Sequence, residues 1–174
     1  MNDTKRKIVV LSDSHGHTAN MEKVFALHHD ADAFIHLGDG AKEFAALCRK
    51  KEKVGYSMLG NCDFAFECPW ADHPCAIYTV GSKKFFMTHG SAYGVKSGRD
   101  TLLRSASEKC LDADFVLYGH THVPENRYLP EENGFKKPIY LINPGSISRP
   151  REGSPSYALI LIKGENVITN IAYM

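Results

Sequence analysis

Aspartate, asparagine and histidine side chains recur along this sequence at the points where short apolar runs end. Five such places hold Asp13 with His15, Asp39, Asn61, His89, and His120 with His122. Because α/β architectures build their sites at the carboxyl ends of strands, we expect these seven side chains to meet at one edge of a sheet. Short loops at such an edge hold side chains rigidly on a scaffold.

The residue types indicate a metal site. Imidazole and carboxylate ligands together suit zinc, iron(II) or manganese(II) better than calcium. Seven side chains are too many for one ion that must also keep water, and they suit two ions that share a bridging carboxylate. Two ions ~3.5–4 Å apart can clamp the attacking and leaving oxygens of a displacement at phosphorus and lower the pKa of a bridging water. The set predicts hydrolysis of a phosphate ester.

Each cluster alone also has an ordinary interpretation. Residues 13–15 can cap a turn, and residues 38–40 and Asn61 are typical turn chemistry. His120 and His122 stand at i and i+2, so on an extended segment they would point to opposite faces and could not chelate one ion. They would instead serve two neighbouring ions or lie on a turn. The order and strand-end placement of all five clusters together favour the metal site.

The elements that must position these residues follow from the apolar patterning. We predict strands at residues 8–11, 33–37, 55–59, 76–80, 83–88, 115–118, 139–142, 157–162 and 167–172, and helices at 19–28, 42–49 and 100–110. Thr18 is placed to cap the first helix. The first half reads β-α-β-α-β and the second half mostly as hairpins. This mixture predicts an α+β fold with two mixed sheets packed face to face and helices outside.

Length and composition limit the number of domains, the class of partner and the expected compartment. The 174 residues fit a single domain, 1–174, with a net charge of +1 that argues against general nucleic-acid binding or a membrane-surface protein. The five cysteines are irregularly spaced, which predicts reduced thiols rather than disulfides. The apolar run near the N-terminus is too short for a signal peptide or a membrane helix. We therefore expect a cytoplasmic protein.

The ordered motifs resemble the signature of the calcineurin-like metallophosphoesterases, and most of all its small prokaryotic phosphodiesterase branch. The matching segments are residues 13–15, 38–39, 60–61, 89 and 119–122, with residues 143–146 extending the match toward the C-terminus. The resemblance implies a four-layer α/β-β/α sandwich and two divalent metal ions. Manganese is the first choice, with iron, zinc, nickel or magnesium as alternatives. It assigns Asp13, His15, Asp39 and His122 to one ion and Asp39, Asn61, His89 and His120 to the other, with Asp39 bridging and Asp39, Asn61 and His120 as the catalytic core.

Cys62 is the informative departure from the wider family, in which a histidine that can protonate the leaving group often follows the asparagine. A thiol with an unperturbed pKa of ~8.5 replaces imidazolium poorly. We therefore expect slow hydrolysis of alkyl monoesters and better activity on activated diesters. Cys62, Asp63, Arg149 and Arg151 are candidate substrate contacts, and the arginines are suited to bidentate phosphate binding. A solvated loop is the alternative for the two arginines.

Two other classes of protein compete with a phosphodiesterase. A protein-interaction scaffold of the same fold, as in the metallophosphoesterase-like subunit of retromer, would have a degraded ligand set, whereas all seven ligands are present here. A structural zinc protein would cluster its thiolates at short spacing, and this chain does not. The substrate is expected to be a small-molecule phosphate ester, with nucleotide diesters, cyclic nucleotides and phospholipid-derived diesters as options. A monomer and a homo-oligomer both stay open.

Overall fold

The first of two five-stranded sheets joins the beginning and the end of the chain. The computed structural model describes residues 5–131 and 134–174. Strand order in this sheet is β10-β9-β1-β2-β3, with β1 parallel to β2 and β2 parallel to β3, and with β9 antiparallel to both β1 and β10. The strands are β1 (Arg6–Leu11), β2 (Ala33–His36), β3 (Gly55–Ser57), β9 (Ser156–Lys163) and β10 (Asn166–Tyr173).

The second sheet has the order β4-β5-β6-β8-β7. Strands β5, β6 and β8 run parallel, and the edge strands β4 and β7 are antiparallel to their neighbours. The sheet is therefore mixed, as expected, although less of it is built from hairpins than the sequence pattern suggested. Its strands are β4 (Cys75–Val80), β5 (Lys83–Thr88), β6 (Phe115–Leu117), β7 (Glu125–Leu129) and β8 (Ile139–Asn143).

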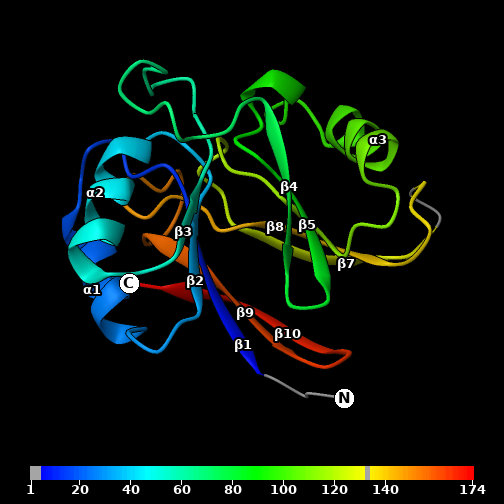
Figure 1. Cartoon of the computed structure of the whole chain (residues 1–174). Coiled ribbons are helices and arrows are strands. Elements are labelled where there is room, and N and C mark those ends of the chain that lie inside the picture. Colours follow the sequence, from blue (N-terminus) through cyan, green and yellow to red (C-terminus); the bar gives the residue numbers. More distant parts are fainter. Residues whose placement is uncertain (1–4, 132–133) are drawn as a thin grey trace.

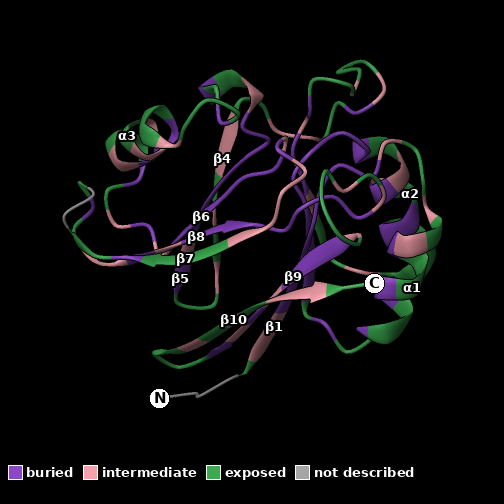
Figure 2. Ribbon diagram, turned by 180° about the vertical axis from the view of Figure 1, so that it is seen from behind, coloured by how far each residue is buried: buried purple, intermediate pink, exposed green. Residues whose placement is uncertain are grey.

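Two sheets and two outer helical layers form a four-layer sandwich, which confirms the predicted fold class (Figure 1). Helices α1 (Ala19–Leu27) and α2 (Ala41–Lys51) cover the first sheet, and α3 (Asp100–Lys109) covers the second. Strand β1 is apolar on both faces because each face packs against another layer. Ile8 and Val10 lie in the cluster between the sheets, whereas Val9 and Leu11 face the helices. A strand buried on both sides reads as a continuous apolar run, and Figure 2 shows such strands as buried.

Two local details differ from the prediction. Strand β7 was not anticipated, because its sequence Glu-Asn-Arg-Tyr-Leu is mostly exposed and polar, and only Leu129 is buried. Thr18 stands at the N-cap of α1 but makes no side-chain capping hydrogen bond. Its backbone is helical (φ −92°, ψ −21°), whereas a capping side chain needs an extended backbone to reach the first free N–H groups.

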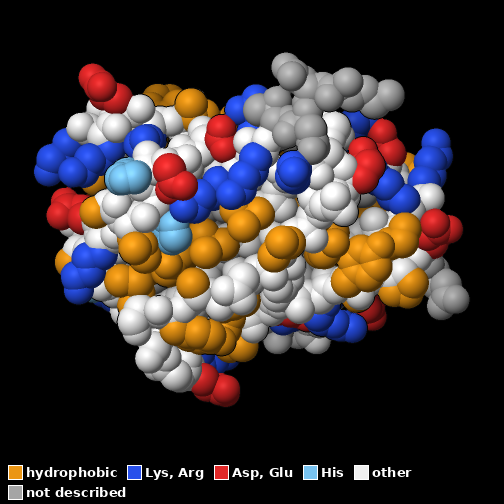
Figure 3. All heavy atoms as spheres, turned by 90° about the horizontal axis from the view of Figure 1, so that it is seen from below, with side chains coloured by type: hydrophobic (Ala, Val, Ile, Leu, Met, Phe, Trp, Pro, Cys, Tyr) orange, Lys and Arg blue, Asp and Glu red, His pale blue; other side chains and the backbone are white. Residues whose placement is uncertain are grey.

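The two ends of the sandwich differ in surface character. Figure 3 looks at the end where β1 begins, where hydrophobic side chains gather between lysine and arginine side chains. The carboxyl ends of β1, β2, β3, β5 and β6 lie at the other end, and the polar clusters follow those strands. Within the described residues, every helix is too short or too polar to cross a bilayer.

Candidate metal centre

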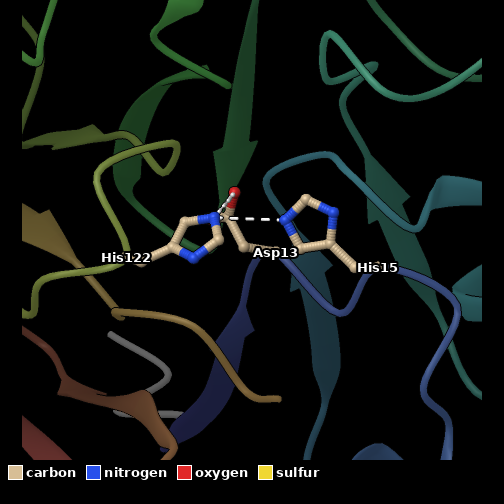
Figure 4. A group of neighbouring side chains, drawn as sticks. All are labelled: Asp13, His15 and His122. Carbon is tan, nitrogen blue, oxygen red and sulfur yellow. Dashed lines mark hydrogen bonds and ion pairs between the residues drawn. The ribbon is translucent and has the colours of Figure 1, made fainter. Parts of the chain in front are cut away.

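The first group of predicted ligands, named here the Asp13 cluster, consists of Asp13, His15 and His122. Figure 4 shows the two imidazole rings approaching from opposite sides, with the Asp13 side chain between them. The His15 and His122 Nε2 atoms lie 3.1 Å apart, and His122 Nε2 lies 3.3 Å from Asp13 Oδ1. The loop after β1 supplies two of these residues, and the loop after β6 supplies the third. The three ligand atoms lie close enough to hold one cation.

The second group, named here the Asp39 cluster, consists of Asp39, His89 and His120 with Asn61 beside them. His89 Nε2 lies 3.1 Å from His120 Nδ1 and 3.1 Å from Asn61 Oδ1. Each of the four residues follows a different strand, respectively β2, β5, β6 and β3. The structure thus brings all seven predicted ligands into two adjoining groups.

Asp39 lies between the two groups. Its Oδ2 atom is 3.7 Å from His15 Nε2 and 3.7 Å from His89 Nε2, so one oxygen faces a histidine of each group. Its Oδ1 atom accepts a hydrogen bond from the Cys62 backbone N–H at 2.7 Å. That bond fixes the carboxylate in the orientation that turns Oδ2 toward both histidines.

The donor set fits divalent cations on evidence from the structure itself. Among the described residues no group makes a well-formed hydrogen bond to the buried Asp13 Oδ1, and His122 Nε2 at 3.3 Å is its polar neighbour, an arrangement that a bound cation would relieve. His89 Nδ1 contacts the Leu37 carbonyl oxygen at 2.7 Å, and His122 Nδ1 contacts the Arg149 carbonyl oxygen at 2.6 Å. Because a carbonyl only accepts, Nδ1 donates to it in both rings, and in the neutral ring Nε2 would present its lone pair to a cation, the arrangement that metal-binding histidines use.

Backbone strain is concentrated in these ligands. Five of the six described non-glycine residues with positive φ belong to the two clusters. A left-handed backbone at such residues costs about 1–3 kcal/mol each and persists where the surrounding structure enforces it. The strained turn also explains how His120 and His122, only two residues apart, contribute to different clusters. The residues are Asp13 (54°), His15 (46°), Asp39 (57°), His120 (69°) and His122 (59°).

Glycines let the ligand loops approach one another. A Cβ atom on Gly60 would lie 2.1 Å from Asp39 Oδ1, and one on Gly119 would lie 2.1 Å from Ser12 Oγ. Both distances are far inside van der Waals contact, so any larger side chain would push a ligand loop out of place. The glycines before Asn61 and His120 are therefore required by packing, independently of any chemistry.

The pKa values of His120, His122 and Asp13 are shifted in different directions by their surroundings. Burial, with smaller electrostatic effects of His89 and Lys96, lowers the pKa of His120 to about 4. The contact with the Asp13 carboxylate outweighs burial at His122 and raises its pKa. Burial raises the pKa of Asp13, but His122, His89 and Ser12 outweigh it, so the net pKa is lowered. Asp13 is therefore an anion and His120 a neutral imidazole at neutral pH, the forms that bind metal.

A cavity of about 250 Å³ opens beside the clusters and contains three of the four predicted substrate contacts. His15, Asp39, Cys62, Asp63 and Arg149 are among its lining residues. The Arg149 guanidinium is exposed and lies 3.2 Å from His17 Nε2. Arg151 is exposed and does not line the cavity.

Asp63 has a different environment from the other three. Its carboxylate accepts backbone hydrogen bonds from Asp39 (2.7 Å), Gly40 (2.8 Å), Ala41 (3.1 Å) and Gly60 (2.8 Å). These donors belong to the loop that carries Asp39, the start of α2 and the loop that carries Asn61. One side chain thus ties two ligand loops together, a role that a sequence pattern does not reveal.

Further residues that the sequence analysis did not single out complete the surroundings. Lys96, in the loop between β5 and α3, acts electrostatically on both His120 and His122. Asn143 Nδ2 donates to the Gly119 carbonyl oxygen at 3.0 Å, and Ser146 Oγ donates to the Asp13 carbonyl oxygen at 2.7 Å. The turn at residues 143–146 therefore supports both ligand loops of the Asp13 cluster from below.

The chain belongs to the calcineurin-like phosphoesterase superfamily, whose domain model matches residues 7–165. It is 31% identical to a probable metallophosphoesterase of Bacillus subtilis, YsnB, over 91% of this chain and 85% of that protein. It is 27% identical to the Escherichia coli K12 phosphodiesterase YfcE over 88% of this chain and 86% of that one. A crystal structure of a predicted phosphoesterase from Streptococcus pneumoniae TIGR4 superposes with a TM-score of 0.76 at 29% identity, covering 98% and 90% of the two chains.

Proposed function

We propose that this protein is a phosphodiesterase that depends on two divalent cations, with Mn²⁺ the first choice. The observation that carries the proposal is the position of Asp39 Oδ2, 3.7 Å from a histidine of each cluster. A carboxylate placed in this way suits a bridging ligand. Asp13, His15 and His122 would complete the set around one cation, and Asn61, His89 and His120 the set around the other. The family membership supports the phosphoesterase activity, and the relationship to YfcE supports the choice of a diester.

The chain's own residues would orient the substrate and balance its charge. When bound, the two cations supply Lewis acidity and lower the pKa of a water that can attack phosphorus in line. Arg149 at the cavity is placed to hold a phosphate oxygen in bidentate fashion. Lys96 adds a second positive charge on the opposite loop. We assign Asp63 to the positioning of the ligand loops, because its carboxylate already accepts four backbone hydrogen bonds.

The preference for a diester rests on Cys62. Burial and the nearby Asp39 and Asp63 carboxylates raise the pKa of this thiol to about 11. A thiol this weakly acidic donates a proton poorly to an alkoxide leaving group, whereas an activated diester releases a stabilised phenolate without it. We expect slow turnover of alkyl monoesters and faster turnover of aryl diesters.

A screen of metals against substrates tests the proposal. Metal-free protein is reconstituted with Mn²⁺, Fe²⁺, Zn²⁺, Ni²⁺ or Mg²⁺ and assayed with methyl p-nitrophenyl phosphate and with an alkyl monoester. We expect two equivalents of metal per chain and hydrolysis of the diester. The absence of turnover with every metal would contradict the proposal. Far less than two equivalents after reconstitution would favour the interaction scaffold instead.

A further inference from the structure

Two exposed phenylalanines, Phe64 and Phe66, follow Asn61, the predicted ligand in the loop after β3. The exposed fraction is 60% for Phe64 and 81% for Phe66, and their ring centroids are 5.7 Å apart at an interplanar angle of 38°. Most phenylalanines of this chain are buried in the three apolar clusters. Two large apolar side chains that lie close together in water form a small apolar patch, the kind of surface that a ligand or partner can cover.

The segment that carries the two rings is anchored at both ends. Asp63 holds its beginning through the four backbone hydrogen bonds of the ligand loops. Downstream, Cys68 is 1% exposed and Lys42 Nζ donates to Glu67 Oε1 at 2.8 Å. Turn hydrogen bonds join Glu67 N–H to the Phe64 carbonyl oxygen at 2.9 Å and Cys68 N–H to the Ala65 carbonyl oxygen at 3.2 Å. The rings therefore project from a fixed backbone, which lowers the entropy lost when they bind a partner.

The segment that carries the two rings begins at the rim of the cavity, although neither ring lines the cavity itself. Cys62 and Asp63 line the cavity, and Phe64 is the next residue. Because successive Cα atoms are about 3.8 Å apart, the Phe64 Cα lies within about 8 Å of the Cys62 Cα. Figure 1 shows the segment between β3 and β4 rising at the same end of the molecule as the segment between β5 and α3, which carries Lys96.

We propose that Phe64 and Phe66 form a platform that stacks against a flat aromatic group of the phosphate ester bound at the metal centre. This inference rests on the proposed phosphodiesterase function and adds a substrate class to it. A nucleobase or an aryl ring has the required shape, and stacking on aromatic side chains does not demand a particular base. A substrate with only small alkyl groups would leave both rings in water.

Inhibition constants test the platform without involving a leaving group. Ribose 5-phosphate, phenyl phosphate and adenosine 5′-phosphate are measured as inhibitors of methyl p-nitrophenyl phosphate hydrolysis by the Mn²⁺-reconstituted protein. Ribose 5-phosphate and adenosine 5′-phosphate share the phosphate and the sugar, so the ratio of their constants reports the base alone. We expect at least a fivefold preference for adenosine 5′-phosphate, and a ratio near one in a Phe64→Ser/Phe66→Ser variant. Stronger inhibition by adenosine 5′-phosphate than by phenyl phosphate would identify a nucleobase, and equal inhibition would identify any aryl group.

Two control variants separate stacking from general damage. Phe64→Leu/Phe66→Leu keeps apolar side chains but lacks flat faces, so we expect it to lose most of the preference. Tyr128→Ser removes an aromatic side chain that is 61% exposed and lies beside the β4–β5 turn, so the preference should be unchanged. Wild-type protein without a preference, or a double serine variant that keeps it, would overturn the platform. If the wild type does not hydrolyse the ester, the proposed function has failed, and calorimetric titration of the same three ligands still decides whether the platform exists.

Discussion

The Asp13 and Asp39 clusters contain the same types of ligand but lie in different environments. The side chains of His15 and His122 are 15% and 23% exposed, whereas those of Asp39 and His89 are 3% and 2% exposed. Contact with Asp13 raises the pKa of His122, while burial lowers the pKa of His120 to about 4. Equivalent motifs in a sequence thus place His89 deep in the protein and leave His15 and His122 partly exposed, and they give His120 and His122 opposite pKa shifts.

Removing the carboxylate shared by the clusters should have the largest effect. Asp39→Asn keeps the size of the side chain and an acceptor for the Cys62 N–H but loses the bridging charge. We expect both metal equivalents to be lost and diester hydrolysis to fall more than a hundredfold, beyond the ~10–100-fold typical of outer-shell partners. Elemental analysis and steady-state kinetics measure this. Asp112→Asn, a change to an exposed aspartate paired with Lys84, is the control. Two retained equivalents would contradict Asp39 as a bridge.

Asp63→Asn should weaken both clusters without altering a ligand. The amide loses the charge that faces the backbone donors of Asp39, Gly40, Ala41 and Gly60, and its NH₂ group opposes some of them. We expect metal affinity to fall ~10–100-fold and the metal-free protein to lose ~1–3 kcal/mol of stability. Competition with a fluorescent chelator and urea unfolding measure the two effects. Unchanged affinity and unchanged stability together would show that Asp63 does not position the loops.

Chelation kinetics should sharpen the difference between the clusters. Because His15 and His122 are more exposed than His89, we expect EDTA to remove metal from the loaded protein in two phases, with the faster one from the Asp13 cluster. His122→Asn should abolish the fast phase and leave about one equivalent bound. His89→Asn should abolish the slow phase. Stopped-flow measurement with a metal indicator separates the phases, and a single phase in the wild type would show that the two positions are equally accessible.

His36 should have the narrowest effect, which is confined to the pH dependence of stability. Its ring lies beneath the ligand loops, with Nδ1 accepting from the Gly38 N–H at 3.2 Å and Nε2 facing Ser14 Oγ at 3.2 Å. Burial, only partly offset by Asp63 and Asp13, lowers its pKa to about 4. Between about pH 6.5 and 4 the unfolded chain binds a proton that the folded chain excludes.

Stability of the metal-free protein should therefore be full above about pH 6.5 and fall as the pH drops toward 4, with the His36 share on the order of 3 kcal/mol. Urea unfolding at several pH values in the presence of a chelator measures the slope. His36→Gln should have a shallower slope, with the remainder owed to other groups such as His120. An identical slope in the variant would mean that His36 is not the group that titrates.

Much of the fold followed from local patterns. Apolar runs located β1, β2, β5 and β6 because these strands are buried on both faces, and the expected helices coincide with α1, α2 and α3 to within a few residues. Strand β7 was not predicted because it lies at the sheet edge and exposes most of its side chains. The parallel pairing of β6 with β8 was not predicted either, because register and strand order depend on contacts between segments distant in sequence.

The sequence by itself determined the ligand types, the strand ends that carry them and the membership of a phosphoesterase family. The family resemblance already implied how those candidate ligands divide between two ions, and the tertiary structure shows what brings each group together. The left-handed turns at residues 13–15, 39 and 120–122 and the close packing of Gly60 against Asp39 bring the loops together. The different burial and pKa values of His120 and His122, and the tie that Asp63 makes between loops, are likewise absent from the sequence pattern. They arise from distances between residues far apart in the chain, which residue types and spacing do not specify.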